Sequence, residues 1–362
     1  MWSFCVTPNS SRTMSAGTAK AIRTPFSSIC CTVALTKPWT RPHDLGILFG
    51  QVAEYRRDGG LCCGHRLFLR FLYGPMGRFR DPQWDVWNED ARLQLEKEMD
   101  VKEYAPFREA FTAYARSWFT GDPKVGRHLT LKLDHSFRVC AHVSELAACE
   151  PALADREVLR VLKIAALFHD VARFEQFVTF KTFADDLSWN HGVIGARTVL
   201  RQGFIKKEPP AVRRLILGAV ALHNRPVLPA ALPEKLRLVL SALRDADKLD
   251  ILRVMEGHLK PDGIADNVVL LHLADEPERC SPAVLSALEE RRIALYRDMR
   301  YYNDFRIVLC TWVFDLHFPT ALHIVKREGY IERIIDGLAA VPEVREKAGV
   351  AVKAALEPSI NV

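Results

Sequence analysis

The chain has 362 residues, of which 49% are hydrophobic and 26% are charged, a composition typical of a soluble globular protein. It excludes an intrinsically disordered chain and a collagen-like repeat. No uncharged apolar run reaches the roughly 18 to 20 residues needed to cross a bilayer, so the sequence predicts no integral membrane protein. The length suits one large domain or two small ones.

The charge is uneven along the chain. Fifty Lys and Arg against 44 Asp and Glu give a net charge of +6. Residues 1–80 hold eleven Lys/Arg and three Asp/Glu, or +8, which leaves 39 against 41, or −2, for the rest. The main body therefore gives no electrostatic reason to expect nucleic acid as a partner.

Residues 1–80 mix Ser, Thr, Pro, Gly and Arg with few acidic residues and show no clear helical period. This composition is compatible with a transit peptide. The interpretation we favour is a poorly structured leader, or an extension read from an upstream start codon before a domain proper that begins near Met99. We therefore predict a leader over 1–80 and one helical domain with a C-terminal helical extension over 81–362.

The cysteines follow the same division, since five of the nine lie in residues 1–80. The other four, Cys140, Cys149, Cys280 and Cys310, show no C-x-x-C metal spacing. We expect them to be reduced thiols, which favours a cytoplasmic location.

Amphipathic stretches broken by Pro and Gly follow from about Asp81, with almost no alternation of period two. This pattern predicts an all-α fold. Asp155 has the position of an N-cap for one of the apolar helices. The predicted helices are 131–147, 158–168, 212–222, 236–252, 284–299 and 306–316.

The predicted helix 158–168 is apolar nearly all round and is followed by His169 and Asp170. A buried imidazole and carboxylate need a compensating partner, and a divalent cation is the most direct one. Other residues of ligand type lie on or at the ends of the remaining apolar stretches. They are His135, His191, His223 and the pair Asp245 and Asp247 in LRDADKLD. Converging helices that each supply such a residue can build a metal site in the core of a bundle.

In this order, His135, His169-Asp170, His191, His223 and DADKLD resemble the HD superfamily of metal-dependent phosphohydrolases. The segments LFHDVARFEQF, SWNHGVIGA, ALHNR and RDADKLDILRV are similar to a bacterial subgroup of stand-alone HD-domain proteins. The resemblance spans roughly residues 105–340 and includes the later motif WVFDLHFPTAL.

The resemblance implies an all-helical HD-domain bundle in which His135, His169, Asp170 and Asp247 hold one divalent cation. Asp247 is preferred to Asp245 because the closing ligand of the family usually precedes a basic residue and Leu. His191 and His223 match the extra histidines of binuclear members, in which the Asp of the HD pair bridges two ions. One or two ions of Mn, Fe, Co, Ni or Zn suit such ligands.

His169 and Asp170 are the expected catalytic pair, because a bound metal activates water for attack on a phosphoryl group. Lys248 and Arg173 lie beside ligands in the sequence and could contact a phosphate, or form surface or structural ion pairs. Asn224, Gln176 and Glu175 could orient the imidazoles. The other histidines after residue 80, at positions 128, 142, 258, 272, 317 and 323, have no such context and are interpreted as core or surface residues.

The predicted function is a metal-dependent phosphohydrolase acting on a small-molecule phosphoester, such as a nucleotide or related metabolite, with no membrane or nucleic acid partner. One alternative is an HD-type diiron oxygenase, which uses the same ligands. Another is a regulatory binding module that keeps the metal without turnover. GxGxxG, GxxxxGK and GxSxG motifs are absent. The sequence does not identify the oligomeric state.

Overall fold

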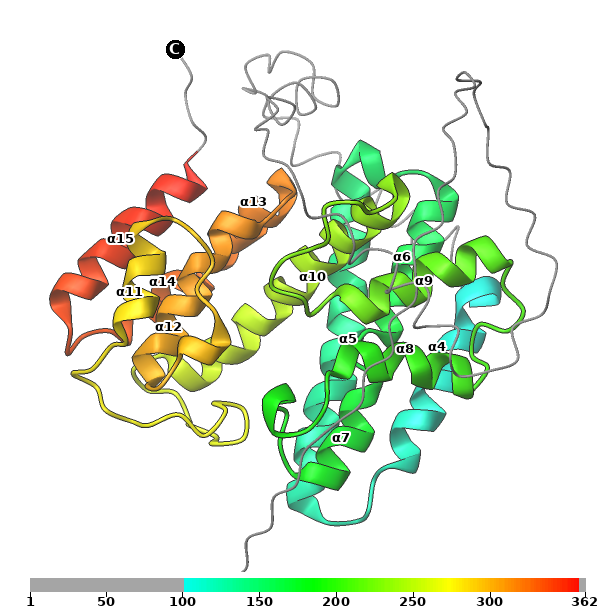
Figure 1. The fold of residues 1–362 in the computed structure, drawn as a ribbon, viewed down its shortest axis with the longest axis horizontal. Coiled ribbons are helices and arrows are strands. Elements are labelled where there is room, and N and C mark those ends of the chain that lie inside the picture. Colours follow the sequence, from blue (N-terminus) through cyan, green and yellow to red (C-terminus); the bar gives the residue numbers. More distant parts are fainter. Residues whose placement is uncertain (1–100, 358–362) are drawn as a thin grey trace, which may run out of the picture. The chain divides into compact units, whose positions relative to one another are not determined.

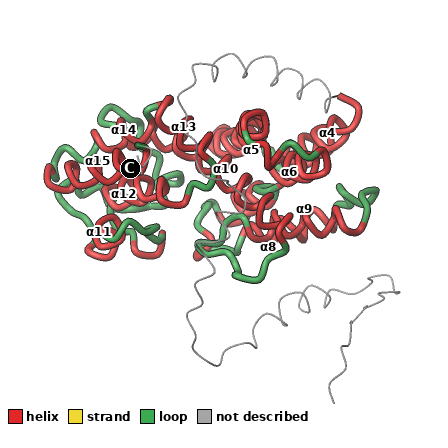
Figure 2. Tube along the Cα trace, turned by 90° about the horizontal axis from the view of Figure 1, so that it is seen from above, coloured by secondary structure: helices red, strands yellow, loops and turns green. Residues whose placement is uncertain are grey.

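The structure is a computed structural model that describes residues 101–357. Within this range the chain forms α-helices and short 3-10 helices, and its one isolated β-bridge joins Ala274 to Tyr301 (Figure 2). The prediction of an all-α fold is thus confirmed. The prediction of a leader over 1–80 lies outside the described residues. No helix in the described range is long and apolar enough to cross a membrane.

The helices follow one another along the chain with short connections (Figure 1). The α-helices are α4 (Val101–Ser117), α5 (Pro123–Cys149), α6 (Arg156–Phe168), α7 (Ala172–Phe180), α8 (His191–Arg201), α9 (Pro210–Leu222), α10 (Glu234–Leu259), α11 (Pro282–Glu289), α12 (Tyr302–Thr311), α13 (Pro319–Glu328), α14 (Tyr330–Asp336) and α15 (Pro342–Leu356). The 3-10 helices are η1 (Pro151–Leu153), η2 (Asp185–Leu187), η3 (Tyr296–Asp298) and η4 (Trp312–Asp315).

Four predicted helices lie inside α5, α6, α9 and α10. The Asp155 side chain caps α6 by accepting a hydrogen bond from the Val158 amide at 2.9 Å, as the sequence suggested. The other two predicted helices were wrong in extent. The helix expected over 284–299 ends at Glu289, because Arg291 adopts a left-handed conformation with φ of 51°. The helix expected over 306–316 becomes 3-10 from Trp312.

Helix α10 holds the described structure together. It packs against α5, α6 and α9 on one side and against α12, α13 and α14 on the other (Figure 1). Its middle residues, including Ala242, Ala246 and Leu249, are buried. Chemical groups on the middle of α10 are therefore enclosed by both groups of helices.

An aromatic cluster fills the core beside the end of α6. The Phe168 ring stacks on Phe204 with centroids 4.8 Å apart and meets Phe111 edge-on at 5.7 Å. Phe111 also contacts the rings of Phe137 and Phe174. Since Phe168 is fully buried, this cluster fixes the position at which α6 ends.

Replacing Phe168 by Ala should lower the free energy of unfolding by about 3 to 5 kcal/mol, because it removes a buried ring and leaves a cavity. Urea or thermal denaturation measures the loss. The matched control is Leu200→Ala on α8, where the side chain is 44% exposed and the change should stay within about 0.5 kcal/mol. Equal losses in the two variants would contradict the importance of this cluster.

Candidate metal centre

His169 and Asp170 occupy the junction between two helices. His169 is the C-cap of α6, and α7 begins at Ala172. Both side chains are buried, with relative exposures of 0% and 3%. The Nδ1 atom of His169 donates to the Ala166 carbonyl at 2.7 Å, which fixes the ring against the last turn of α6. The helix end therefore holds Nε2 of His169 and the Asp170 carboxylate in the core.

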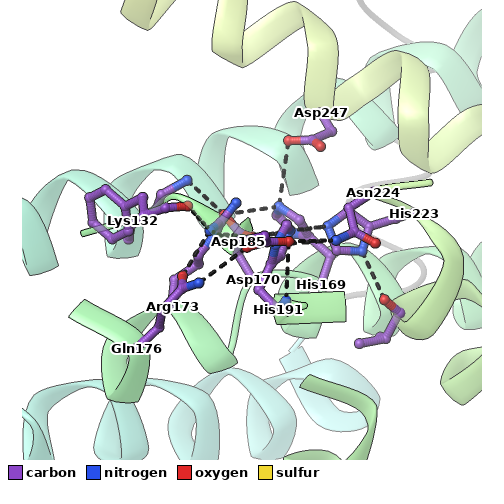
Figure 3. Close-up of polar contacts among 12 residues, drawn as sticks. Lys132, His169, Asp170, Arg173, Gln176, Asp185, His191, His223, Asn224 and Asp247 are labelled. Carbon is purple, nitrogen blue, oxygen red and sulfur yellow. Dashed lines mark hydrogen bonds and ion pairs between the residues drawn. The ribbon is translucent and has the colours of Figure 1, made fainter. Parts of the chain in front are cut away.

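The first half of the site joins this pair to α5 and α10. The Nε2 atom of His135 lies 3.2 Å from Nε2 of His169 and 3.1 Å from Oδ1 of Asp247. Asp247 Oδ1 is also 3.6 Å from His169, and Asp170 Oδ2 lies 3.6 and 3.7 Å from the two imidazoles. Figure 3 shows Asp247 reaching this group from α10. The structure thus brings together the four residues expected around the first ion.

The second half joins the pair to α8 and α9. His191 begins α8, His223 follows the last turn of α9, and their Nε2 atoms are 3.1 Å apart. Oδ1 of Asp170 lies 3.4 Å from His191 and 3.9 Å from His223. The two oxygens of Asp170 therefore face different pairs of imidazoles.

Close approach of α8 and α9 sets the spacing of the second pair. A Cβ atom added to Gly192 would lie 2.7 Å from Asn224 Oδ1 and 3.0 Å from the Val220 carbonyl. Only glycine gives the backbone of α8 this access. The residue after His191 therefore allows the second imidazole pair to form.

All four imidazoles make a hydrogen bond through Nδ1. The acceptors are Asp250 for His135, the Ala166 carbonyl for His169, Asp185 for His191 and the Val220 carbonyl for His223. Because these acceptors require a proton on Nδ1, the Nε2 atom of each neutral ring presents a lone pair. Two lone pairs at 3.1 to 3.2 Å repel each other unless a metal cation or a proton lies between them.

The donor set fits a divalent transition metal by this argument. Each half offers two imidazole nitrogens and a carboxylate oxygen of Asp170, and the first half adds Asp247. Oδ1 of Asp247 is buried and has no hydrogen-bond partner, which leaves it available as a ligand. Imidazole with carboxylate suits Mn, Fe, Co, Ni or Zn.

Burial and neighbouring charges shift the pKa values of the ligands. Burial would raise the pKa of Asp170, but the charges of Lys132, His169 and Arg173 hold it well below its usual range. Burial would also raise the pKa of Asp247, but hydrogen bonds and charges from His135 and His169 hold it well below its usual range. Both carboxylates are therefore ionised and able to bind a cation at neutral pH.

The histidines of the two halves differ: burial would lower the pKa of His169, but the charges of Asp170 and Asp247 raise it, whereas the pKa values of His191 and His223 are lowered. Burial, together with the charges of His191 and His169, lowers the pKa of His223 to about 3. Burial and then the Arg173 charge lower the pKa of His191. Since both rings are neutral at pH 7, no proton occupies their Nε2 atoms in competition with a metal.

Two cations flank Asp170 on one side (Figure 3). Lys132 on α5 donates to Asp170 Oδ2 at 2.8 Å. Arg173 on α7 donates through Nε to Asp170 Oδ1 at 3.3 Å and through Nη1 to the side chains of Gln176 and Asp185. Arg173, predicted as a phosphate contact, is thus anchored beside the ligand pair.

Other predicted residues lie in different surroundings. Lys248 does not bond to the ligand cluster and instead donates to the carbonyl and carboxylate of Asp315. This geometry favours a structural ion pair over the predicted phosphate contact. Asp245 accepts from the amides of His317 and Phe318 at 2.8 and 2.9 Å, away from the imidazoles. Glu175 pairs with Arg201 near the surface.

Gln176 and Asn224 act on the site indirectly, since both donate to Asp185. Asp185, Asp250 and Lys132 were not predicted from the sequence. Asp250 is held by Arg138 and Arg253 as well as His135. Asp250 lies three residues after Asp247, and Lys132 lies three residues before His135. Each is therefore within one helical turn of a ligand. This spacing was the sequence signal that could have identified Asp250 and Lys132.

Comparison with known proteins agrees with this geometry. Residues 133–278 match the family model of the HD domain. This segment of the chain is an HD domain. The matched segment contains all six expected ligands, from His135 to Asp247. No curated protein and no solved structure matches the chain.

Asp170→Ala should reduce the bound metal of the HD centre strongly while the fold survives, since it removes the one carboxylate shared by both halves. Metal content by mass spectrometry and helicity by circular dichroism measure the two effects. In the wild type, a metal at 100 times its Kd should stabilise the fold by about 2.7 kcal/mol, and the variant should lose most of this gain.

The control is Asp134→Ala, which removes an exposed carboxylate beside His135 on α5. It should keep full metal content. If Asp170→Ala retained the metal of the wild type, the carboxylate would have a structural role only.

Proposed function

We propose that the chain is a metal-dependent phosphohydrolase that acts on a phosphoester. The observation that carries the proposal is the orientation of the four imidazoles, whose Nδ1 hydrogen bonds turn the Nε2 lone pairs toward the two carboxylates. Neutral imidazoles so arranged repel one another, and a divalent cation between them relieves this repulsion. Membership of the HD superfamily supports the same reaction class.

A bound divalent cation supplies Lewis acidity, which lowers the pKa of a water ligand and neutralises charge on a phosphoryl group. His135, His169, Asp170 and Asp247 would hold one such cation, and His191, His223 and Asp170 would hold a second. The chain contributes no nucleophilic side chain in this scheme. Its own task is to hold the ligands and to orient the substrate.

The partly exposed side chains around Asp170 support an anionic substrate. Lys132 and Arg173 keep relative exposures of 16% and 13%, whereas the side chains of His169 and Asp170 are at most 4% exposed. Arg173 uses Nε and Nη1 within the site, and its Nη2 makes no hydrogen bond with the described residues. A fixed guanidinium with a remaining donor group suits phosphate recognition.

The substrate class that we favour is a nucleotide or related small phosphorylated metabolite. A second candidate function, a diiron oxygenase, is favoured by one observation. Both halves of the site are complete, and four His with two Asp suit two irons as well as two hydrolytic metals. A regulatory module that binds metal without turnover has no specific observation in its favour.

The wild-type chain loaded with Mn²⁺ should release phosphate from p-nitrophenyl phosphate or from a panel of nucleotides. Asp170→Ala should lower the rate at least about a hundredfold, because metal assistance contributes several kcal/mol. Asp134→Ala should keep the wild-type rate. Oxygen uptake with Fe²⁺, without phosphate release, would favour the oxygenase instead. The absence of both activities would favour the regulatory module.

A further inference from the structure

Asp315 connects the last part of the chain to helix α10. It lies at the end of η4, beyond the segment that matches the HD domain. Its carboxylate accepts from Nη2 of Arg244 at 2.9 Å and from Nζ of Lys248, and its carbonyl accepts from Lys248 at 2.6 Å. We call these three residues the Asp315 cluster.

Both cations of the cluster depend on Asp315. Arg244 and Lys248 are each 7% exposed, and a buried charge without a partner is strongly destabilising. Within residues 104–357, Asp315 is the one carboxylate that lies within hydrogen-bond distance of either cation. Loss of its negative charge would therefore displace both side chains or the elements that carry them.

Arg244 connects the cluster to the second half of the metal centre. Its Nη1 donates to the His223 carbonyl at 2.9 Å and also to the Arg225 carbonyl. Carbonyls at a helix C-terminus lack partners within the helix, so Arg244 supplies one. Because the His223 ring is hydrogen-bonded to the backbone of α9 at Val220, a shift of this backbone moves Nε2 of His223.

Lys248 connects the cluster to the first half, since it follows Asp247 in α10. Arg244 and Lys248 are four residues apart and share one face of the helix. Asp245, on the same helix, is held by the amides of His317 and Phe318. These contacts fix the rotation of α10 about its axis, and that rotation determines where Asp247 points.

We infer that Asp315 is a positioning residue of the metal centre, which acts through Arg244 on His223 and through Lys248 on Asp247. The inference rests on the metal centre of the proposed function. It assigns to the C-terminal helices a direct role in ligand geometry. An ordinary structural ion pair would instead affect stability alone.

The test is titration of the metal-free full chain with Co²⁺, followed by its visible absorption and by calorimetry. Asp315→Asn should weaken Co²⁺ binding by at least about tenfold, within the range found for groups that orient metal ligands. Asp315→Glu, which keeps the charge, should recover most of the affinity. Wild-type affinity in a folded Asp315→Asn variant would overturn the inference.

The matched control is Glu150→Gln. Glu150 is also buried and attaches α13 through the amide and hydroxyl of Thr320, but it contacts none of the metal ligands. This variant should lose stability and keep its Co²⁺ affinity. Equal weakening of Co²⁺ binding in Glu150→Gln and Asp315→Asn would reduce Asp315 to a structural role.

A second variant covers the case in which Asp315→Asn does not fold. Lys248→Met leaves the pair of Arg244 and Asp315 in place and should still weaken Co²⁺ binding. A double variant, Arg244→Met with His223→Ala, tests the route through His223. Arg244→Met should weaken Co²⁺ binding no further once His223 is absent. Full affinity in Lys248→Met, or additive losses with His223→Ala, would contradict the corresponding route.

These measurements do not require turnover. Loss of Co²⁺ affinity in Asp315→Asn would uphold the inference even if the wild type hydrolysed no phosphoester, in which case the proposed function alone would fail. If the wild type hydrolysed a phosphoester and Asp315→Asn bound Co²⁺ with full affinity, the inference would fail and the proposed function would stand. A wild-type chain that binds no Co²⁺ would overturn both.

Discussion

Repulsion between buried imidazole lone pairs is the constraint on which the site depends. The Nδ1 hydrogen bonds leave four Nε2 atoms in two close pairs, and Asp170 presents one oxygen to each pair. In water such groups would separate and be hydrated, but five helices bring them together inside a bundle. The free energy of folding must therefore offset the repulsion between these groups, and a bound cation reduces that repulsion.

Helix α10 meets this constraint as α5 does for His135, because its ligand lies in the middle of a long helix, of 26 residues in α10 and 27 in α5. His169, His191 and His223 lie at helix ends, where small changes of backbone direction can adjust a side chain. Asp247 lacks that freedom, so its position depends on how the whole of α10 is packed. This is the physical reason for contacts such as Asp245 with Phe318 on the far side of the helix.

Much of the fold and of the inner site could be predicted from the sequence. Apolar stripes identified α5, α6, α9 and α10, and the ligand types at their ends indicated which side chains would meet. The residues that orient the ligands were harder to identify. Asp185 lies in a 3-10 helix without periodicity, and Asp250 resembles an ordinary charged helix residue until its partners Arg138 and Arg253 are placed.

The partner of Lys248 could not be predicted from the sequence, for a different reason. Its neighbour Asp247 suggested a place at the site, yet successive helix residues point about 100° apart. Lys248 consequently meets Asp315, 67 residues later in the chain. The end of the helix expected over 284–299 likewise depends on the left-handed backbone at Arg291, a residue type that gives no local signal of it.

Gly192 limits how this chain can vary. The separation of His191 and His223 is set by direct approach of two backbones, not by side chains that could be exchanged in compensating pairs. A larger residue at 192 cannot be accommodated by repacking, since the atoms in its way include main-chain carbonyls of Val220 and Ala221. Any other residue at this position would push the main chains of α8 and α9 apart, and the spacing of His191 and His223 would change with them.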